Sequence, residues 1–241
     1  VSALIGLADG RPVLQFCRSS GRVGALRREF GGTHVHVWRE PRNQWWSYKV
    51  ADYVERVTQL IYRSELLPQA LCEIRSMAGI GRGRPRLLRP QRNYLAFYGL
   101  WLDAWLRLQS QSDLSISLDG IATSSAENAD CSRRLSELSG RAIDLSDVRT
   151  SGMVFTADEQ AFYSQIESAV SAVFVRSGRA TWQGIEAAGE AARSARQAYE
   201  SLAHDAIVEL DLRHATLERM GLLAGQEWAA GSVWSPRFNP R

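Results

Sequence analysis

The chain has 241 residues and a formal net charge of +3 at pH 7, with 45% hydrophobic and 23% charged residues. This length suits one α/β domain with a sizeable core, and the composition is ordinary for a globular protein. The mild positive charge gives no reason to expect a nucleic-acid partner. No apolar run reaches the roughly 18–20 residues that span a bilayer, so we expect no transmembrane segment.

The three cysteines, Cys17, Cys72 and Cys131, are odd in number, widely spaced and free of any C-x-x-C pair. This usage is typical of a reducing compartment and argues against a disulfide framework or a zinc site. The four histidines show no spacing typical of metal ligands, and no signal segment opens the chain. We therefore expect a cytoplasmic protein without a metal cofactor.

The first part of the chain predicts a βαβ unit. Residues 12–17 (P-V-L-Q-F-C) predict a buried strand, residues 23–30 have helical spacing, and residues 34–38 are rich in β-branched and aromatic side chains. Two strands joined by such a crossover should be parallel. The loop at residues 18–22 would then lie at the same edge of the sheet as Arg39, which follows the second strand.

The most informative stretch is T-H-V-H-V-W-R-E-P-R-N-Q-W-W-S-Y-K, at residues 33–49. Pro41 has no N–H to donate to a sheet, so the strand should end at Arg39. From Asn43 on, the apolar spacing becomes helical. An Arg at the carboxyl end of a strand, a helix N-terminus and the hydroxyl of Ser47 in the first turns of that helix favour a phosphate or sulfate site in a solvent-facing cleft.

This stretch resembles the 3′-phosphate-binding segment of the sulfotransferases, which use 3′-phosphoadenosine 5′-phosphosulfate as sulfuryl donor. The family pattern is a hydrophobic strand, then R-x-P, then a Ser eight residues after the Arg, and Arg39, Pro41 and Ser47 match it. The resemblance implies a P-loop NTPase-like parallel sheet flanked by helices, and it assigns the donor's 3′-phosphate to Arg39 and Ser47. Arg42 lies outside the pattern and is an equally charged control for Arg39, which we expect to be solvated.

The implied activity is transfer of a sulfuryl group to a hydroxyl or amine of a glycan, lipid or small-molecule acceptor. The family's other signature, a 5′-phosphosulfate loop resembling P-K/R-S-G-T-T, is not matched by R-S-S-G-R, which begins only 21 residues before Arg39. We therefore expect that loop to lie upstream of Val1, which would make the chain a fragment. Arg18, Ser19 and Arg22 are candidates for donor or acceptor contacts on geometric grounds alone, and no catalytic base is identified.

The middle of the chain predicts two helical segments around an irregular one. Residues 52–77 have helical spacing that is interrupted at Pro68. Residues 79–90 contain too much Gly, Pro and Arg for a helix or central strand, and they form either a basic loop that closes over an anionic ligand or a solvated connector. Residues 91–108 regain helical spacing with five aromatic side chains, which either pack on the sheet or line an acceptor pocket.

A second strand pattern, L-S-I-S-L at residues 114–118, ends in Asp119 and precedes a helix expected at 127–138 and stopped by Gly140. It resembles the sulfotransferase strand that carries a tyrosine–acid pair before a helix. This looser match extends the resemblance over roughly residues 12–150 and implies a structural role for Asp119.

The remainder of the chain predicts helices. A capping box at Thr156–Glu159 should start a helix that runs to about Val175. Residues 181–223 are Ala-rich and almost wholly helical, with Glu and Arg spaced as solvated i,i+4 pairs. We therefore divide the chain into a partial sulfotransferase-like α/β domain at 1–155 and a helical extension and tail at 156–241. The extension's helices are candidates for oligomer contacts.

Two alternatives to a sulfotransferase stay open on the sequence. The chain could be a non-catalytic module of the same fold that binds a nucleotide or an anionic glycan, which the unmatched 5′ loop favours. It could instead be another phosphate-handling transferase, such as a kinase or a glycosyltransferase, that uses the same anion site.

Overall fold

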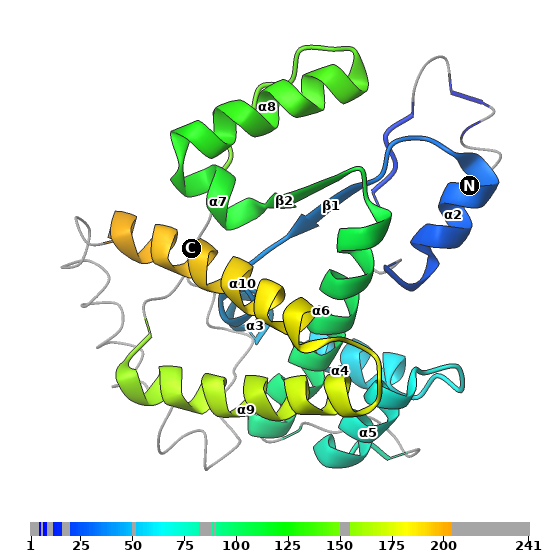
Figure 1. Cartoon of the computed structure of the whole chain (residues 1–241), viewed down its shortest axis with the longest axis vertical. Helices are drawn as coiled ribbons and strands as arrows, with labels where there is room; N and C mark the ends of the chain where they lie inside the picture. The colour runs from blue at the N-terminus through cyan, green and yellow to red at the C-terminus, as the bar shows by residue number, and fades with distance from the viewer. Residues whose placement is uncertain are drawn as a thin grey trace.

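The computed structural model describes residues 5, 7–8, 12–15, 20–49, 52–81, 88, 90–149 and 155–203. Within these residues the chain is mostly helical, with one small parallel sheet, so the expected α/β class holds in this coarse form (Figure 1). The elements in chain order are η1 (Ser20–Arg22), α2 (Val23–Phe30), β1 (Val35–Trp38), α3 (Pro41–Lys49), α4 (Asp52–Ile61), α5 (Gln69–Ala78), α6 (Pro90–Gln111), β2 (Leu114–Ser117), α7 (Leu118–Thr123), α8 (Ser125–Ser139), α9 (Ala157–Arg176) and α10 (Trp182–Ala203).

The sheet is formed by β1 and β2, which run parallel with Val35 opposite Leu114 and Trp38 opposite Ser117. Both strands match the expected β patterns at residues 34–38 and 114–118. Because side chains opposite one another share a face, Leu114 and Val35 point to the same side of the sheet. The pairing brings together two strand ends that are about eighty residues apart in sequence.

The strand predicted at residues 12–17 is wrong for residues 12–15. The structure describes residues 12–15 of this segment, and they form no strand. Val13 is 96% exposed, so it is not the buried strand residue that the sequence predicts. A short apolar run does not show which neighbour, if any, will cover it. Residues 16 and 17 lie outside the described part of the chain.

The helix at the expected position 91–108 is α6, and it forms the centre of the core. All five of its predicted aromatic side chains are at most 8% exposed: Tyr94, Phe97, Tyr98, Trp101 and Trp105. Trp38 of β1 packs edge-on against Trp101 and Trp105, with ring centroids 6.4 and 6.5 Å apart. The burial of these rings therefore confirms the packing interpretation.

The predicted helix boundaries are largely confirmed. Pro68 precedes α5, Gly140 ends α8 in the left-handed conformation, and Thr156 forms the expected capping box with Glu159. The side chain of Thr156 accepts from the N–H of Glu159, whose carboxylate accepts from the N–H of Thr156. The basic segment at 79–90 stays a prediction, because its arginines are not among the described residues.

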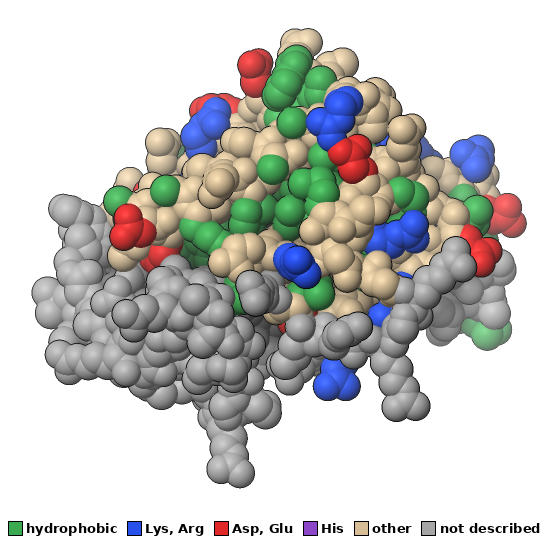
Figure 2. All heavy atoms as spheres, turned by 90° about the horizontal axis from the view of Figure 1, so that it is seen from below, with side chains coloured by type: hydrophobic (Ala, Val, Ile, Leu, Met, Phe, Trp, Pro, Cys, Tyr) green, Lys and Arg blue, Asp and Glu red, His purple; other side chains and the backbone are tan. Residues whose placement is uncertain are grey.

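The proposed boundary between residues 155 and 156 also stays a prediction. The described helices beyond it share one hydrophobic core with α3, α5 and α6, to which they contribute Tyr163, Phe174 and Ala188. Figure 2, which views the molecule of Figure 1 from below, shows hydrophobic side chains at the surface between scattered charges of both signs. Within the described residues, no helix has the length and apolar composition needed to cross a bilayer.

Candidate functional site

The candidate site begins where the two strands end. Because β1 and β2 are parallel and Trp38 lies opposite Ser117, the residues that follow them emerge at the same edge of the sheet. Arg39 follows β1 directly, and Asp119 lies in the first turn of α7, directly after β2. In open α/β sheets, the carboxyl ends of the strands form the usual ligand-binding edge.

Arg39 and Asp119 form an ion pair at this edge. The Nε and Nη2 atoms of Arg39 each lie 3.3 Å from Oδ1 of Asp119. The Asp119 side chain is fully buried and that of Arg39 is only 18% exposed. A buried carboxylate needs such a partner, because an uncompensated charge in the interior is costly. The expectation that Arg39 lines a solvent-facing cleft therefore needs correction, since most of its side chain is covered.

The peptide group between Arg39 and Glu40 forms a hydrogen bond through its N–H and another through its carbonyl oxygen. The N–H of Glu40 donates to Oδ2 of Asp119 at 2.7 Å. The carbonyl of Arg39 accepts from Nε1 of Trp101, in α6, at 3.0 Å. Two helices, α7 and α6, thus fix the turn that joins β1 to α3, and such support makes the position of a functional side chain reproducible.

The side chain of Glu40 caps the start of α3. Glu40 precedes Pro41, the first residue of the helix, and its Oε2 accepts from the N–H of Asn43 at 2.7 Å. This is the contact of an N-cap side chain with a free helical N–H. The expectation that this N–H is available to an external phosphate or sulfate is therefore wrong, because the carboxylate of Glu40 occupies it.

Glu40 is buried, and it pairs with the C-terminal helix α10. Its Oε1 lies 3.2 Å from Nη1 of Arg196. Burial raises the pKa of Glu40 to about 7, although the charge of Arg196 and the N–H of Asn43 both act to lower it. The sequence did not indicate this contact, since Arg196 belongs to a helix whose charges were interpreted as solvated.

Arg42 is also buried, contrary to the expectation of a solvated control residue. It forms a bidentate ion pair with Glu167 of α9, in which Nε donates to Oε1 at 2.9 Å and Nη2 donates to Oε2 at 2.8 Å. Its guanidinium carbon lies 5.3 Å from the ring centroid of Tyr163. The hydroxyl of Tyr94 donates to the same carboxylate at 2.6 Å. Burial would lower the pKa of Arg42, but the hydrogen bonds and charge of Glu167 raise it overall.

Ser47 lies in the last turn of α3, which corrects the expectation that it lies in the first turns. It is six residues past Pro41, about 9 Å along the helix axis. Its hydroxyl donates to the carbonyl of Gln44 at 2.8 Å. A hydroxyl has a single proton to donate, so binding a phosphate would require rotation away from Gln44.

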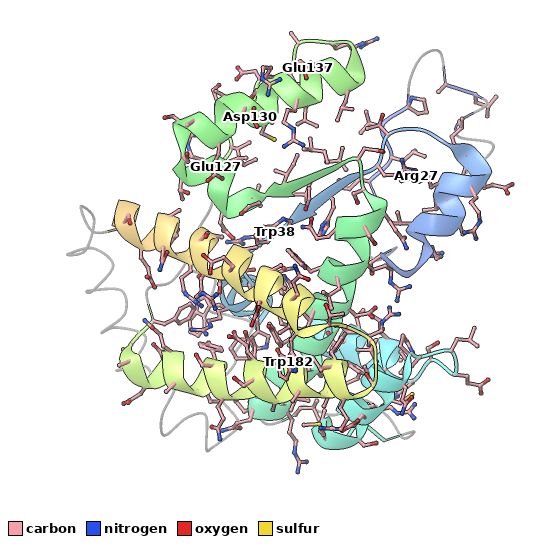
Figure 3. The ribbon with its side chains drawn as sticks, viewed as in Figure 1. Arg27, Trp38, Glu127, Asp130, Glu137 and Trp182 are labelled. Carbon is pink, nitrogen blue, oxygen red and sulfur yellow. The ribbon has the colours of Figure 1, made fainter. Side chains whose placement is uncertain are left out.

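Of the other predicted site residues, Arg22 is the last residue of η1, whereas Arg18 and Ser19 lie outside the described residues. The helix after Arg22 contacts the amino-terminal end of β2, where Nη2 of Arg27 lies 2.6 Å from Oδ1 of Asp113. Figure 3 shows Arg27 and Trp38 at opposite ends of the sheet. The structure therefore does not bring Arg22 to the edge that carries Arg39.

A separate groove of about 370 Å³ lies between β2 and α8. Its floor is apolar, and its rim carries Glu127 and Asp130, which Figure 3 shows along α8, together with Arg134. Burial raises the pKa of the Cys131 thiol in this groove, which disfavours the reactive thiolate. Among the described residues, no group of three or more His, Cys, Asp or Glu side chains is placed to hold a metal ion.

The parallel strands, the R-x-P turn and the acid at the second strand end define an α/β site with a fixed Arg at its edge. No family model, curated protein or solved structure matches the chain.

Proposed function

We propose that the chain is part of a cytoplasmic sulfotransferase of P-loop-like fold that uses 3′-phosphoadenosine 5′-phosphosulfate. One observation carries this proposal. Arg39 stands at the carboxyl end of a parallel strand, directly before a helix, and an acid at the neighbouring strand end holds its guanidinium. That arrangement supports the R-x-P resemblance, since it sets the Arg of the motif where α/β folds bind anionic ligands.

In this proposal, Arg39 binds the 3′-phosphate through its planar guanidinium, which matches phosphate geometry better than an ammonium does. Asp119 keeps the guanidinium in one orientation through Nε and Nη2. Ser47 adds a hydrogen bond after its hydroxyl turns from Gln44. When bound, the donor supplies the sulfuryl group, which moves in line to an acceptor hydroxyl or amine. The bond from sulfur to the 5′-phosphate oxygen breaks, adenosine 3′,5′-bisphosphate leaves, and the acceptor releases its proton to solvent. Arg39, Asp119 and Ser47 thus hold the nucleotide end of the donor, and positioning of this kind accounts for much of the rate in group transfer.

Calorimetry with two nucleotides tests the proposal. The chain should bind adenosine 3′,5′-bisphosphate at least tenfold more tightly than adenosine 5′-monophosphate, because a hydrogen bond to a charged group contributes about 1.5–3 kcal/mol. Equal affinities for the two nucleotides would contradict it. Incubation with labelled donor and a panel of glycan, lipid and small-molecule acceptors then tests transfer.

A non-catalytic module that binds a nucleotide or an anionic glycan is the second candidate. The observation that favours it is the absence of a P-K/R-S-G-T-T match in the sequence. Such a module would retain the preference for the 3′-phosphorylated nucleotide and yet transfer no sulfuryl group to any acceptor. Another phosphate-handling transferase would lack the preference for the 3′-phosphate.

A further inference from the structure

Helix α10 lies next to both strand ends of the candidate site. It packs against α7, which carries Asp119, and against α6 (Figure 1). Its inward side is made of small residues, with Ala188, Ala192 and Ala195 at most 8% exposed. Small side chains allow a helix to approach its neighbours closely. From this position α10 can act on the R-x-P turn.

An ion pair links α10 to the turn and gives it a route to Arg39. Arg196 holds Oε1 of Glu40 at 3.2 Å, and Oε2 of the same carboxylate accepts from the N–H of Asn43 at 2.7 Å. The N–H of Glu40 donates to Asp119, which in turn holds the guanidinium of Arg39. Arg196 therefore reaches the Arg39 site through Glu40, the residue next to Arg39.

We propose that Arg196 is a positioning residue, which acts through Glu40 to fix the R-x-P turn and so sets the affinity of the Arg39 site for a 3′-phosphate. The part that concerns affinity rests on the function proposed above. The part that concerns the turn does not, because the geometry of Glu40 can be measured without a nucleotide.

The pKa of Glu40 provides a second test of the proposal. Only the ionised carboxylate attracts Arg196, and Arg196 lowers the pKa of Glu40 against the effect of burial. Replacing Arg196 should therefore leave Glu40 protonated at higher pH. The other charged or titratable groups that face Glu40 come from α3, α6, α7 and α9, and they are Arg42, Tyr94, Tyr98, Asp119, Tyr163 and Glu167.

The experiment compares Arg196→Met, Arg196→Lys and Arg193→Met. Arg193 lies one turn earlier on α10, is 54% exposed and pairs with Glu190 on the surface, so it is a matched control. Amide hydrogen exchange of Glu40 and Asn43 measures the turn directly. We expect Arg196→Met to speed their exchange roughly tenfold or more, Arg196→Lys to restore much of the protection, and Arg193→Met to change it less than twofold.

Nucleotide binding by the same variants gives the second measurement. Arg196→Met should weaken the binding of adenosine 3′,5′-bisphosphate roughly tenfold. The loss of affinity should be larger at pH 8, where Glu40 is ionised, than at pH 6. If the unmodified chain has no preference for the bisphosphate, the sulfotransferase proposal fails and amide exchange alone decides the role of Arg196. Unchanged exchange at Glu40 and Asn43 in Arg196→Met would overturn the inference, whatever the nucleotide result.

A double variant covers the case in which Arg196→Met does not fold. Glu40→Gln removes the charge that Arg196 neutralises, so Arg196→Met made in that background leaves no buried charge unpaired. If Arg196 acts through Glu40, this second change should add less than a twofold effect on Asn43 exchange. An added effect of tenfold would show that Arg196 acts on the turn by another route, and would overturn the inference.

Discussion

The N–H of Glu40 donates to Oδ2 of Asp119 at 2.7 Å, although 79 residues separate the two in sequence. This bond links the ends of two parallel strands, and the same carboxylate holds the guanidinium of Arg39. The turn that carries the R-x-P motif therefore depends on a residue from the following strand end.

Replacing Asp119 should destabilise the fold. Asp119→Ala leaves the N–H of Glu40 without its acceptor and Arg39 without its counter-charge, so we expect a loss of about 3 kcal/mol or more in the free energy of unfolding. Asp119→Asn keeps an acceptor oxygen and should cost less. Urea denaturation measures both. Asp130→Ala is the control, because Asp130 is exposed on α8 and pairs there with Arg133 and Arg134, and such pairs contribute about 0–1 kcal/mol.

Arg39 and Ser47 should contribute unequally to nucleotide binding. Arg39→Lys keeps a charge beside Asp119 and loses the planar fork, whereas Ser47→Ala removes one hydroxyl. Both variants should bind adenosine 3′,5′-bisphosphate more weakly, Arg39→Lys by roughly ten- to a hundredfold and Ser47→Ala by less. Their affinity for adenosine 5′-monophosphate should change little. Calorimetry provides the measurement.

The control for that series is Arg28→Ala, since Arg28 is exposed in α2. Arg42 is unsuitable, because it is buried against Glu167 and its loss would disturb the core. If Arg28→Ala weakens binding as much as Arg39→Lys does, the effect is general electrostatics, and the role of Arg39 loses its support.

The features that the sequence predicted well are local ones. The strand before Arg39, the strand before Asp119 and the capping box at Thr156 each depend on residues within a few positions of one another. Period-two alternation, a proline and a capping pair are enough to predict such features. The aromatic run in α6 likewise indicated burial, because large rings at helical spacing seldom face water together.

The features that were missed depend on long-range partners. Glu190 and Arg193 are an exposed surface pair, at i,i+3 and not the predicted i,i+4 spacing. Arg196, three residues later, turns inward to Glu40. Arg42 is likewise buried by Glu167, 125 residues away. Nothing in the local pattern distinguishes these arginines from exposed ones, because the difference lies in which side of the helix faces a buried acid.

Two buried groups should give opposite dependences of stability on pH. The pKa of Glu40 is raised from 4.5 to about 7, so its contribution to stability is complete below pH 4.5 and is lost as the pH rises through 7. Burial lowers the pKa of His36 from 6.5 to about 4, so its contribution is present above pH 6.5 and is lost as the pH falls through 4. Between about pH 4.5 and 6.5 the two effects oppose each other.

Single variants separate these effects. The stability of the unmodified chain minus that of Glu40→Gln should fall as the pH rises from 4.5 to 7. The corresponding difference for His36→Gln should rise between pH 4 and 6.5. Urea denaturation at four pH values across this range gives both slopes. Slopes of the same sign for the two variants would contradict the assignment.

Gly99 of α6 should be intolerant of even a methyl group, although alanine is the better helix former. A Cβ at this position would lie 2.6 Å from the hydroxyl oxygen of Tyr62 and 2.8 Å from Cδ1 of Ile74, both in fully buried side chains. Overpacking a core costs about 1–3 kcal/mol, which exceeds the gain of about 1 kcal/mol in helix propensity. Gly189→Ala in α10 is the matched control, because its Cβ would meet only the flexible end of Arg193 at 3.4 Å. Thermal unfolding should therefore show a lower Tm for Gly99→Ala and an equal or higher Tm for Gly189→Ala, and a stabilised Gly99→Ala would show that α6 does not approach Tyr62 this closely.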